Sequence, residues 1–446
     1  MDDGRLNGPS QMAERDYQRV VRGWAMYDWA NSAFAVVILT AIFPVYYRAL
    51  ALDAGAAPQS ATAYWAYTTS LSLLLVAALG PLAGAAADLL GAKKRFLAAA
   101  LWLGVLGTAS LALLGAGEFL IASLLFAVAN LGFAGGNIFY ESLLPQVARP
   151  EDLDRVSVRG YALGYLGGGL LLLVNALWLY RPQWFWMADR SAALRACFIS
   201  VAGWWLVFSL PLFRAVAEPM VQGRPRASRA FADSVARLVQ TFREIRRYRE
   251  LALFLAAFWL YNDGIGTIIK LAAAYGDEIG IGHNDMLGAL ILTQFIGFPC
   301  SIGFGVLAQY WDAKRAIFFG LAVYSVISVA GFFVRSSGEF YALAMMVGVV
   351  QGGTQALSRS LFATMVPKTH SAEFFGFFST GEKVAGIAGP VIFGLVGQLT
   401  GSSRWGILSI TLLFAAGALL LRRVDVAEGR RVAALVDAST QERNSS

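Results

Sequence analysis

The stretch GAAADLLGAKKR (residues 84–95) returns 221 residues later as GVLAQYWDAKR (residues 305–315). Both copies keep the spacing Gly-x3-(Asp/Gln)-x2-(Gly/Asp)-Ala-Lys-(Lys/Arg) without a gap. Each copy follows one apolar segment and precedes another, and each ends in adjacent basic residues. Self-similarity at a fixed offset is a sign of repeated structural units, so the repeat indicates a chain made of two similar halves.

Composition defines the class of protein. Of the 446 residues, 57% are hydrophobic and 15% are charged, whereas soluble domains carry about 25% charged residues. Apolar segments of about 20 residues are long enough to cross the hydrocarbon core of a bilayer as helices. We expect an all-α membrane protein with twelve such helices, at roughly 25–48, 64–87, 96–115, 119–142, 159–180, 196–213, 251–275, 286–309, 316–334, 339–361, 374–398 and 404–421.

The basic residues predict how the chain lies in the membrane. With a cytoplasmic amino terminus, the inner segments hold 27 of the 36 Lys and Arg residues and the outer segments hold six. This asymmetry follows the positive-inside rule, so we expect both termini in the cytoplasm. The net charge of +7 is then explained by topology and by contact with anionic lipid head groups, not by nucleic-acid binding.

The repeat divides the chain into five parts. Beyond the repeated stretch, Trp24-x2-Tyr27-Asp28 in the first predicted helix matches Trp259-x-Tyr261-Asn262-Asp263 in the seventh. We therefore expect an amino-terminal tail, a first six-helix half, a central loop, a second six-helix half and a carboxyl-terminal tail, at 1–23, 24–213, 214–250, 251–421 and 422–446. Parallel halves related by an axis along the membrane normal are typical of major facilitator transporters.

Several motifs carry a more specific resemblance. The stretch at 84–95 resembles the signature loop of the major facilitator superfamily. The segments YDWANSAFAVVILTAIFPVYY, FYESLLP, WLYNDGIGTII and QALSRSLF, which begin at residues 27, 139, 259 and 355, resemble its vacuole-effluxer branch, also called the unknown major facilitator or UMF family. The resemblance implies twelve helices, transport by alternating access, a central cavity lined by helices 1, 4, 7 and 10, and, for the fungal vacuolar members, amino-acid efflux. The short central loop and tails resemble those of the bacterial members, which implies a location in a bacterial cytoplasmic membrane.

The same resemblance assigns a structural and gating role to the two signature loops. The residues concerned are Gly84, Asp88, Gly91, Lys93, Lys94, Gly305, Gln309, Asp312, Lys314 and Arg315. The second loop departs from the family pattern, because Gln309 and Asp312 replace the acid and the glycine. We therefore expect the second loop to contribute less to gating than the first.

Polar side chains inside the predicted helices form the candidate substrate site. They are costly in lipid and must face other helices or water. The set comprises Asp28, Asn31, Asn137, Tyr140, Glu141, Tyr261, Asn262, Asp263, Lys270, Gln294, Gln351, Gln355, Arg359, Glu382 and Lys383. For Asp28 the alternative is a side chain that only reaches back to the membrane surface or pairs with a neighbouring arginine. For Asp263 with Lys270 the alternative is a buried structural pair.

Two of these groups receive specific roles. We expect Asp263, near the middle of its helix, to bind a coupling proton, because burial disfavours the charged carboxylate. We also expect Asp28 and Glu141 to form an ionic gate with Arg359, because all three lie at the same inner depth.

Other functions find little support. His283 and His370 lie in loops on opposite sides of the membrane, and no zinc spacing, nucleophile elbow or Gly-x4-Gly-Lys-Ser/Thr loop is present. We therefore expect no enzyme activity, no metal and no cofactor. One chain with two halves carries its own central cavity, so we expect a secondary transporter that works as a monomer. The alternatives are an oligomeric channel and a non-transporting membrane scaffold or sensor. The acids and bases together suit a zwitterion such as an amino acid, with a sugar or a drug as alternative substrates.

Overall fold

The structure, a computed structural model, describes residues 14–218, 233–235 and 248–445. Most of the predicted central loop (214–250) and the first part of the predicted amino-terminal tail (1–23) lie outside the described residues. Throughout the described ranges the regular elements are helices, as predicted. The side chain of Lys383 also lies outside what the structure describes, although its backbone belongs to a helix.

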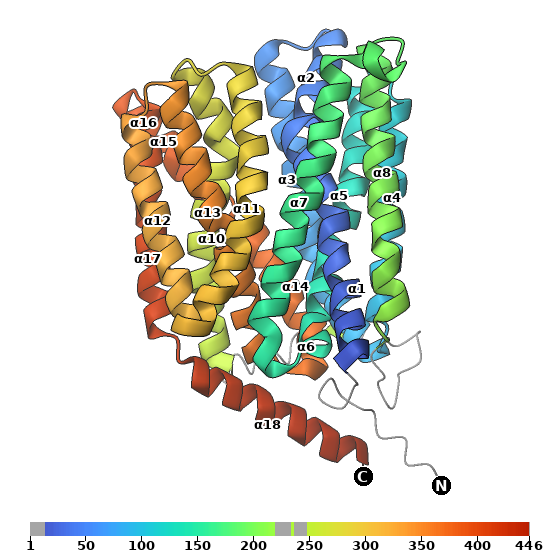
Figure 1. The fold of residues 1–446 in the computed structure, drawn as a ribbon, viewed down its shortest axis with the longest axis vertical. Helices are drawn as coiled ribbons and strands as arrows, with labels where there is room; N and C mark the ends of the chain where they lie inside the picture. The colour runs from blue at the N-terminus through green and yellow to red at the C-terminus, as the bar shows by residue number, and fades with distance from the viewer. Residues whose placement is uncertain (1–13, 219–232, 236–247, 446) are drawn as a thin grey trace.

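The first half of the chain forms a bundle of long helices that run between the two ends of the molecule (Figure 1). Short turns join them. Its elements are α1 (Glu14–Ala33), η1 (Phe34–Ala41), α2 (Phe43–Asp53), α3 (Pro58–Leu90), α4 (Lys93–Ser110), η2 (Leu111–Leu113), α5 (Phe119–Ser142), α6 (Leu144–Val147), η3 (Pro150–Asp152), α7 (Leu153–Tyr180), η4 (Pro182–Phe185) and α8 (Arg190–Ala215).

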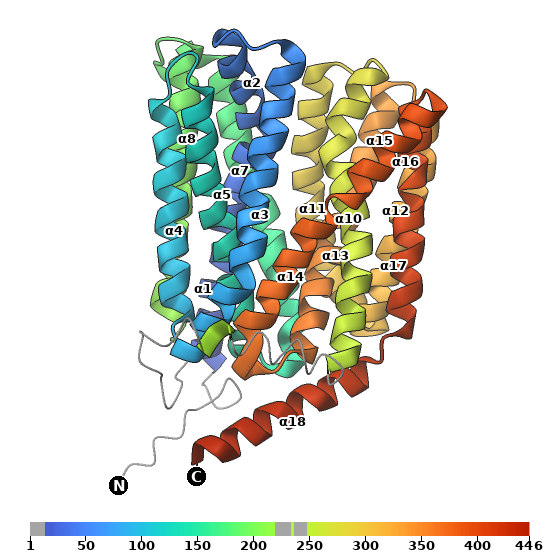
Figure 2. The same cartoon turned by 180° about the vertical axis from the view of Figure 1, so that it is seen from behind.

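The second half forms a similar bundle beside the first, and a last helix crosses one end of the molecule (Figure 2). Its elements are α10 (Arg249–Glu278), α11 (His283–Trp311), α12 (Ala313–Phe333), α13 (Ser337–Met365), η6 (Lys368–His370), α14 (Ser371–Ala385), α15 (Ala388–Thr400), α16 (Ser403–Ser409), α17 (Thr411–Arg423) and α18 (Val426–Ser445).

The first predicted span is longer than expected and bent. Helix α1 begins at Glu14, and the apolar run Phe34–Ala41 continues it as a π-helix. The amide of Ile42 donates to the carbonyl of Val37 at 2.9 Å, and α2 follows at an angle of 44°. Pro44 stands in the first turn of α2, where its missing amide costs no helical hydrogen bond. A bend at this position is therefore compatible with the sequence.

The predicted single helix over 374–398 is wrong, because the structure divides it into α14 and α15. The break falls at Gly386 and Ile387, just before Gly389-Pro390, where a proline ring and small residues disfavour a continuous helix. Within the described residues, ten helices are long and apolar enough to cross a membrane, and the bent α1–α2 pair is an eleventh. Helix α15 falls short of that length, which accounts for the difference from the twelve predicted.

The two halves meet most closely at the end of the molecule that carries the signature loops. Helix α3 packs on α14, and α7 packs on α11 and α13. A side chain at Gly84 would overlap the carbonyl oxygen of Ala372, and one at Gly376 would lie 2.7 Å from the Cα atom of Pro81. Glycine at these two positions allows the backbones of α3 and α14 to approach. This contact closes the molecule at that end.

Candidate functional site

Arg359 forms the centre of a buried charge cluster between the halves. Its side chain lies on α13 and is 1% exposed. Atom Nη2 lies 3.1 Å from Oδ2 of Asp28 on α1, and Nη1 lies 3.9 Å from Oε1 of Glu141 on α5. The structure thus brings together the three charges that the sequence placed at one depth. A buried arginine held by carboxylates from the opposite half links the two halves electrostatically.

Further hydrogen bonds hold the guanidinium and the carboxylate in place. Nε of Arg359 donates to Oγ of Ser157, and Nη2 donates to the carbonyl of the same residue, both at 2.9 Å. The hydroxyl of Tyr140 donates to Oδ2 of Asp28 at 2.7 Å. These contacts satisfy several polar groups that would otherwise be costly to bury.

Three aromatic rings enclose the same guanidinium. Cζ of Arg359 lies 5.0 Å from the ring centre of Trp24, 5.6 Å from that of Tyr140 and 4.4 Å from that of Tyr161. Electron-rich ring faces attract the cation and exclude water from it. Gly160 makes room for the cluster, because a side chain there would overlap Oδ2 of Asp28 and approach Nη2 of Arg359.

A large cavity lies directly beyond this cluster, between the two halves. Its volume is about 960 Å³, and Tyr161 contributes to its lining. The lining reaches Tyr180 at the end of α7 and Asn284 at the start of α11, which are the helix ends far from the signature loops. Tyr161 therefore separates the cavity from Arg359. The cavity is approached from one end of the molecule and closed at the other.

The cavity lining is less charged than the sequence suggested. Of the candidate substrate residues, only Gln294 and Gln351 line it, together with tyrosines that include Tyr46, Tyr165 and Tyr275. Arg190 is the single charged side chain among the described lining residues. The described acids and bases of the candidate set lie outside the lining. Asp28, Glu141 and Arg359 contact one another instead, and Asp263 binds a backbone amide.

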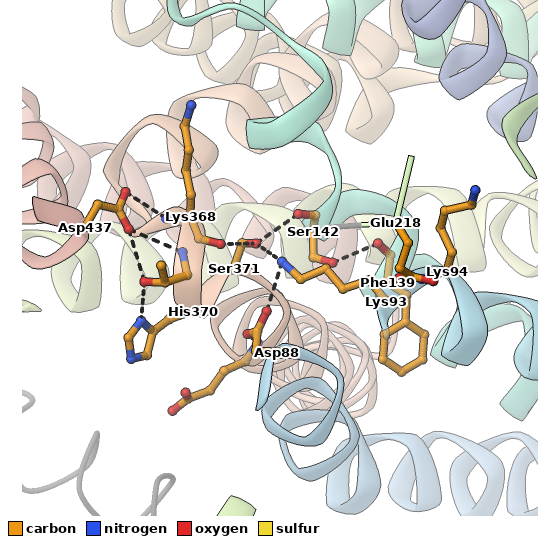
Figure 3. A network of polar contacts seen from close by, with 12 residues as sticks. Asp88, Lys93, Lys94, Phe139, Ser142, Glu218, Lys368, His370, Ser371 and Asp437 are labelled. Carbon is orange, nitrogen blue, oxygen red and sulfur yellow. Dashed lines mark hydrogen bonds and ion pairs between the residues drawn. The ribbon is translucent and has the colours of Figure 1, made fainter. Parts of the chain in front are cut away.

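The first signature loop makes a second polar link between the halves (Figure 3). Lys93 and Asp88 form a buried ion pair with 2.9 Å between Nζ and Oδ1. Oδ2 of Asp88 accepts a hydrogen bond from the amide of Glu373 at 2.8 Å, in the first turn of α14. Nζ of Lys93 donates to Oγ of Ser371 at 2.5 Å. A carboxylate at a helix amino terminus is stabilised by the orphan amides and the helix dipole.

One lysine of each loop caps a helix, although in the repeat Lys314 aligns with Lys93 and not with Lys94. Nζ of Lys94 donates to the carbonyls of Phe213 and Val216 at the end of α8, the former at 3.1 Å. Nζ of Lys314 donates to the carbonyls of Arg422 and Val424 at the end of α17, at 3.2 and 2.8 Å. Each lysine thus caps the last membrane helix of its own half, where a cation is favourable.

The turns of the two loops also correspond. Gly91 has a φ of 54° and Asp312, its counterpart, has a φ of 75°. Asp312 accepts a hydrogen bond from the amide of Arg315 at 2.9 Å and so begins α12. Gln309 is exposed. Gly305 packs against Val158 of α7.

Asp263 lies in a different environment from the one expected. It is 3% exposed on α10, and its Oδ2 accepts a hydrogen bond from the amide of Gly389 at 2.6 Å. It therefore caps the first turn of α15 at the break in the eleventh predicted span. Lys270 is exposed and close enough to interact electrostatically with Asp263. A side chain at Gly389 would approach Oδ1 of Asp263 to 2.9 Å.

The remaining candidates form smaller contacts. Asn31 donates to Asn137 at 2.6 Å, which joins α1 to α5. The hydroxyl of Tyr261 lies 2.6 Å from Oγ of Ser358, and Gln355 donates to Asn262 at 3.4 Å, so both pairs join α10 to α13. Glu382 is half-buried on α14. These residues stabilise helix pairs inside one half.

The sequence did not point to several residues of the site. Trp24, Ser157 and Tyr161 contact Arg359, and Ser371 contacts Lys93. A serine or an aromatic residue in an apolar helix gives no distinctive signal. The one available sign was spacing, since Ser157 and Tyr161 are four residues apart and share a helix face.

Comparisons with known proteins place the chain among transporters. Residues 16–434 match the family described as vacuole effluxer Atg22 like. An uncharacterised MFS-type transporter of Bacillus subtilis, YxiO, is 38% identical over 89% of this chain and 93% of its own length. Autophagy-related protein 22 of Eremothecium gossypii is 24% identical over 92% of both chains.

Solved structures agree on the fold. The proton:xylose symporter XylE, a member of the major facilitator superfamily (MFS), aligns with a TM-score of 0.68 and 13% identity, covering 94% of this chain and 98% of its own. The MFS transporter FucP, in its outward conformation, aligns with a TM-score of 0.64 and 15% identity over 92% of this chain and 98% of its own. At these identities the likeness concerns the fold, which is the predicted major facilitator fold.

Proposed function

Because the chain belongs to the vacuole effluxer Atg22-like family of major facilitator transporters, we propose that it moves a small organic solute across a membrane by alternating access. One observation supports this most directly. The cavity between the halves ends at Tyr161, and the cluster of Arg359, Asp28 and Glu141 lies immediately behind that ring. A solute site on one side and a breakable ionic contact on the other are what alternation requires. Both lie within one chain, which favours a functional monomer.

The cluster is the proposed inner gate. It joins α13 of the second half to α1 and α5 of the first, so the halves cannot separate at that end without breaking it. Removing Arg359 leaves two carboxylates without their main partner in a buried site, which is strongly unfavourable. Arg359→Ala should therefore shift the population toward the state that is open at the signature-loop end and should slow transport.

A charge exchange tests whether the contact is direct. Asp28→Arg and Arg359→Asp each place like charges together, whereas the double variant restores one pair of opposite charges. We expect the double variant to recover part of the transport rate in proteoliposomes that each single variant loses. Equal inactivity of all three, with all three folded, would argue against a direct gate contact.

The orientation remains a proposal based on the basic residues. We propose that the signature loops face the cytoplasm, so that the cavity faces outward in this structure. Ala56 lies in the loop between α2 and α3, and Glu151 lies at the opposite end in η3. Ala56→Cys should react with an impermeant thiol reagent in intact cells, and Glu151→Cys should react only after permeabilisation. The reverse pattern would invert the orientation.

We propose proton coupling at Asp263, as expected from the sequence. Its Oδ1 is buried without a hydrogen-bond partner among the described residues, whereas Oδ2 binds the Gly389 amide. A buried carboxylate with one unoccupied oxygen can take up a proton. Asp263→Asn should abolish proton-driven accumulation and preserve exchange of solute between the two sides. If the variant still accumulates solute with the proton gradient, Asp263 is only the cap of α15.

The cavity favours an amino acid with an apolar side chain over a sugar. Its lining combines tyrosines and aliphatic side chains with the amides of Gln294 and Gln351. Most of the described lining residues are aliphatic or aromatic, although hydroxyls, three amides and Arg190 are also present. An apolar body gains from burial against such a lining, whereas a sugar, whose hydroxyls all need hydrogen-bond partners, gains less. Ligands that bind the folded state raise the melting temperature of the purified protein. We expect leucine or phenylalanine to do so and glucose or xylose not to do so, and the opposite result would exclude this class.

A further inference from the structure

The carboxyl-terminal segment, predicted as a tail, forms helix α18 across the closed end of the molecule (Figure 1). The helix is held to the second half at its start. The amide of Asp425 donates to Oε2 of Glu250 at 2.7 Å, and the amide of Glu428 donates to Oδ1 of Asp425 at 3.1 Å. Gly429 packs on Met365 at the end of α13, where a side chain would lie 2.7 Å from the sulfur atom.

Asp437 ties the middle of α18 to the turn before α14. Its carboxylate accepts hydrogen bonds from the amides of Lys368 and Thr369 at 3.0 and 3.3 Å and from the hydroxyl of Thr369 at 3.1 Å. These three donors belong to η6, the turn that leads directly into α14. A charged acceptor that binds several donors of one short turn restricts its conformation.

The same turn leads to the first signature loop (Figure 3). Oγ of Ser371 lies 3.1 Å from the carbonyl oxygen of Lys368 and 3.0 Å from that of Ser142, and it receives a hydrogen bond from Nζ of Lys93 at 2.5 Å. Lys93 in turn pairs with Asp88. A continuous polar chain therefore runs from α18, through η6, to the loop between α3 and α4 in the other half.

Helix α18 and the first half line a common space at the closed end. A space of about 280 Å³ is lined by Pro145 and Leu153 of the first half, by Val366 of the second half and by Ala433 and Asp437 of α18. Ala433 and Val436 are buried, although they stand in a segment outside the membrane bundle. The hydrogen bonds of α18 are to the second half, so it should move with that half when the closed end opens.

We propose that α18 is a strap that holds the closed end shut, with Asp437 as the residue that transmits its effect to Lys93 and Asp88. The inference rests on the proposed alternating access and adds a regulatory element to it. In the closed state α18 lies under both halves and positions η6, so that Ser371 meets Lys93. In the state that is open at this end, the first half must separate from α18, and Lys93 must separate from Ser371. Weakening the strap therefore favours opening.

The test measures the separation of the halves without a substrate. Nitroxide labels on Glu151→Cys and Tyr310→Cys report the distance between the ends of η3 and α11, in protein with Cys197→Ala and Cys300→Ala. Both labelled side chains are exposed. Asp437→Ala should increase the ratio of long to short distances by about tenfold, as expected for losing hydrogen bonds to a charged group. A chain ending at Asp425 should give at least the same shift.

A matched control lies on the same helix. Glu428 forms an exposed ion pair with Arg431, with 2.7 Å between Oε1 and Nη2, and the described hydrogen bonds to its carboxylate all come from this residue of the same helix. Glu428→Ala should leave the distance ratio unchanged. Melting temperatures of all variants show whether they are folded, and the chain ending at Asp425 supplies a second reading if Asp437→Ala is unstable.

The possible results distinguish this proposal from the proposed gate at Arg359. If Arg359→Ala shifts the distances while Asp437→Ala and the shortened chain match Glu428→Ala, the gate stands and the strap is wrong. A shift toward shorter distances on removal of α18 would also overturn the strap. If neither Arg359→Ala nor removal of α18 ever produces a second distance, both proposals fall, because the halves do not alternate at this end.

Discussion

The two signature loops have the same place in the fold but different partners. In the first loop, Asp88 and Lys93 reach across to α14 of the other half. In the second loop, Gln309 is exposed, and Asp312 and Lys314 bind groups of their own half. The pseudo-symmetric backbone is retained, since Gly91 and Asp312 share a positive φ.

The comparison distinguishes two structural roles of a signature loop. Lys94 and Lys314 both cap the last helix of their own half, so this role is structural. Of the two loops, the first alone makes polar contacts with the other half, within the described residues. An alternating-access protein needs contacts that form and break, and a further polar link from the second loop, added to those of the first loop and of Arg359, would favour a single state. The asymmetry leaves the α7–α11 contact apolar, with Gly305 against Val158.

The largest expected effect comes from Lys93→Ala. The variant leaves Asp88 buried without its cation, and breaking a buried pair costs about 3–5 kcal/mol. We expect it to destabilise the closed state strongly, seen as a lower melting temperature and as longer distances between labels at Glu151 and Tyr310. The counterpart Lys314→Ala should change the melting temperature less and the distances not at all. Equal effects of the two variants on the distances would contradict the difference between the two loops.

A smaller effect is expected from the glycines that begin the two loops. Gly84→Ala places a methyl group against the backbone carbonyl of Ala372, whereas Gly305→Ala meets a side-chain atom of Val158 at 3.1 Å. Overpacking against backbone costs about 1–3 kcal/mol, and a side chain can give way. We expect Gly84→Ala to push α3 from α14 and to lengthen the distance between labels on those helices. An unchanged distance with Gly84→Ala would show that the packing there is looser than described.

The two capping lysines should give matched effects. Lys94→Met and Lys314→Met each keep the aliphatic stem and lose hydrogen bonds to helix carbonyls, which are worth about 1 kcal/mol. We expect similar decreases in melting temperature and no change in the distance ratio. If Lys94→Met alone opened the closed end, the first lysine would also link the halves.

The smallest effect is expected at Gln309. Replacing it with Asp restores the acid that the first loop carries, but the side chain is exposed and donates to no described partner in the other half. Exposed substitutions of this kind change stability by about 0.5 kcal/mol or less. The distance ratio should remain that of the unchanged chain. A shift toward the closed state would mean that a second polar link can form at this site.

The amino-acid sequence determined the class of protein, the repeat of two similar halves and the depth of the charged side chains in the membrane. Apolar length marks a membrane helix, and a rise of 1.5 Å per residue sets how deep Asp28, Glu141 and Arg359 lie. Their mutual contact could therefore be anticipated. The spacing of the signature loops likewise gave their equivalence, because a shared backbone turn requires a shared pattern.

Only the tertiary structure decided which groups meet around those positions. Three features depend on how helices distant in sequence rotate about their axes: the choice of Gly389 as the partner of Asp263, the aromatic rings around Arg359 and the sparsely charged lining of the cavity. That rotation follows from close packing at glycines such as Gly84 and Gly160. Packing of this kind is a property of pairs of surfaces, so a single helix sequence gives its depth in the membrane but not the neighbour that each face will contact.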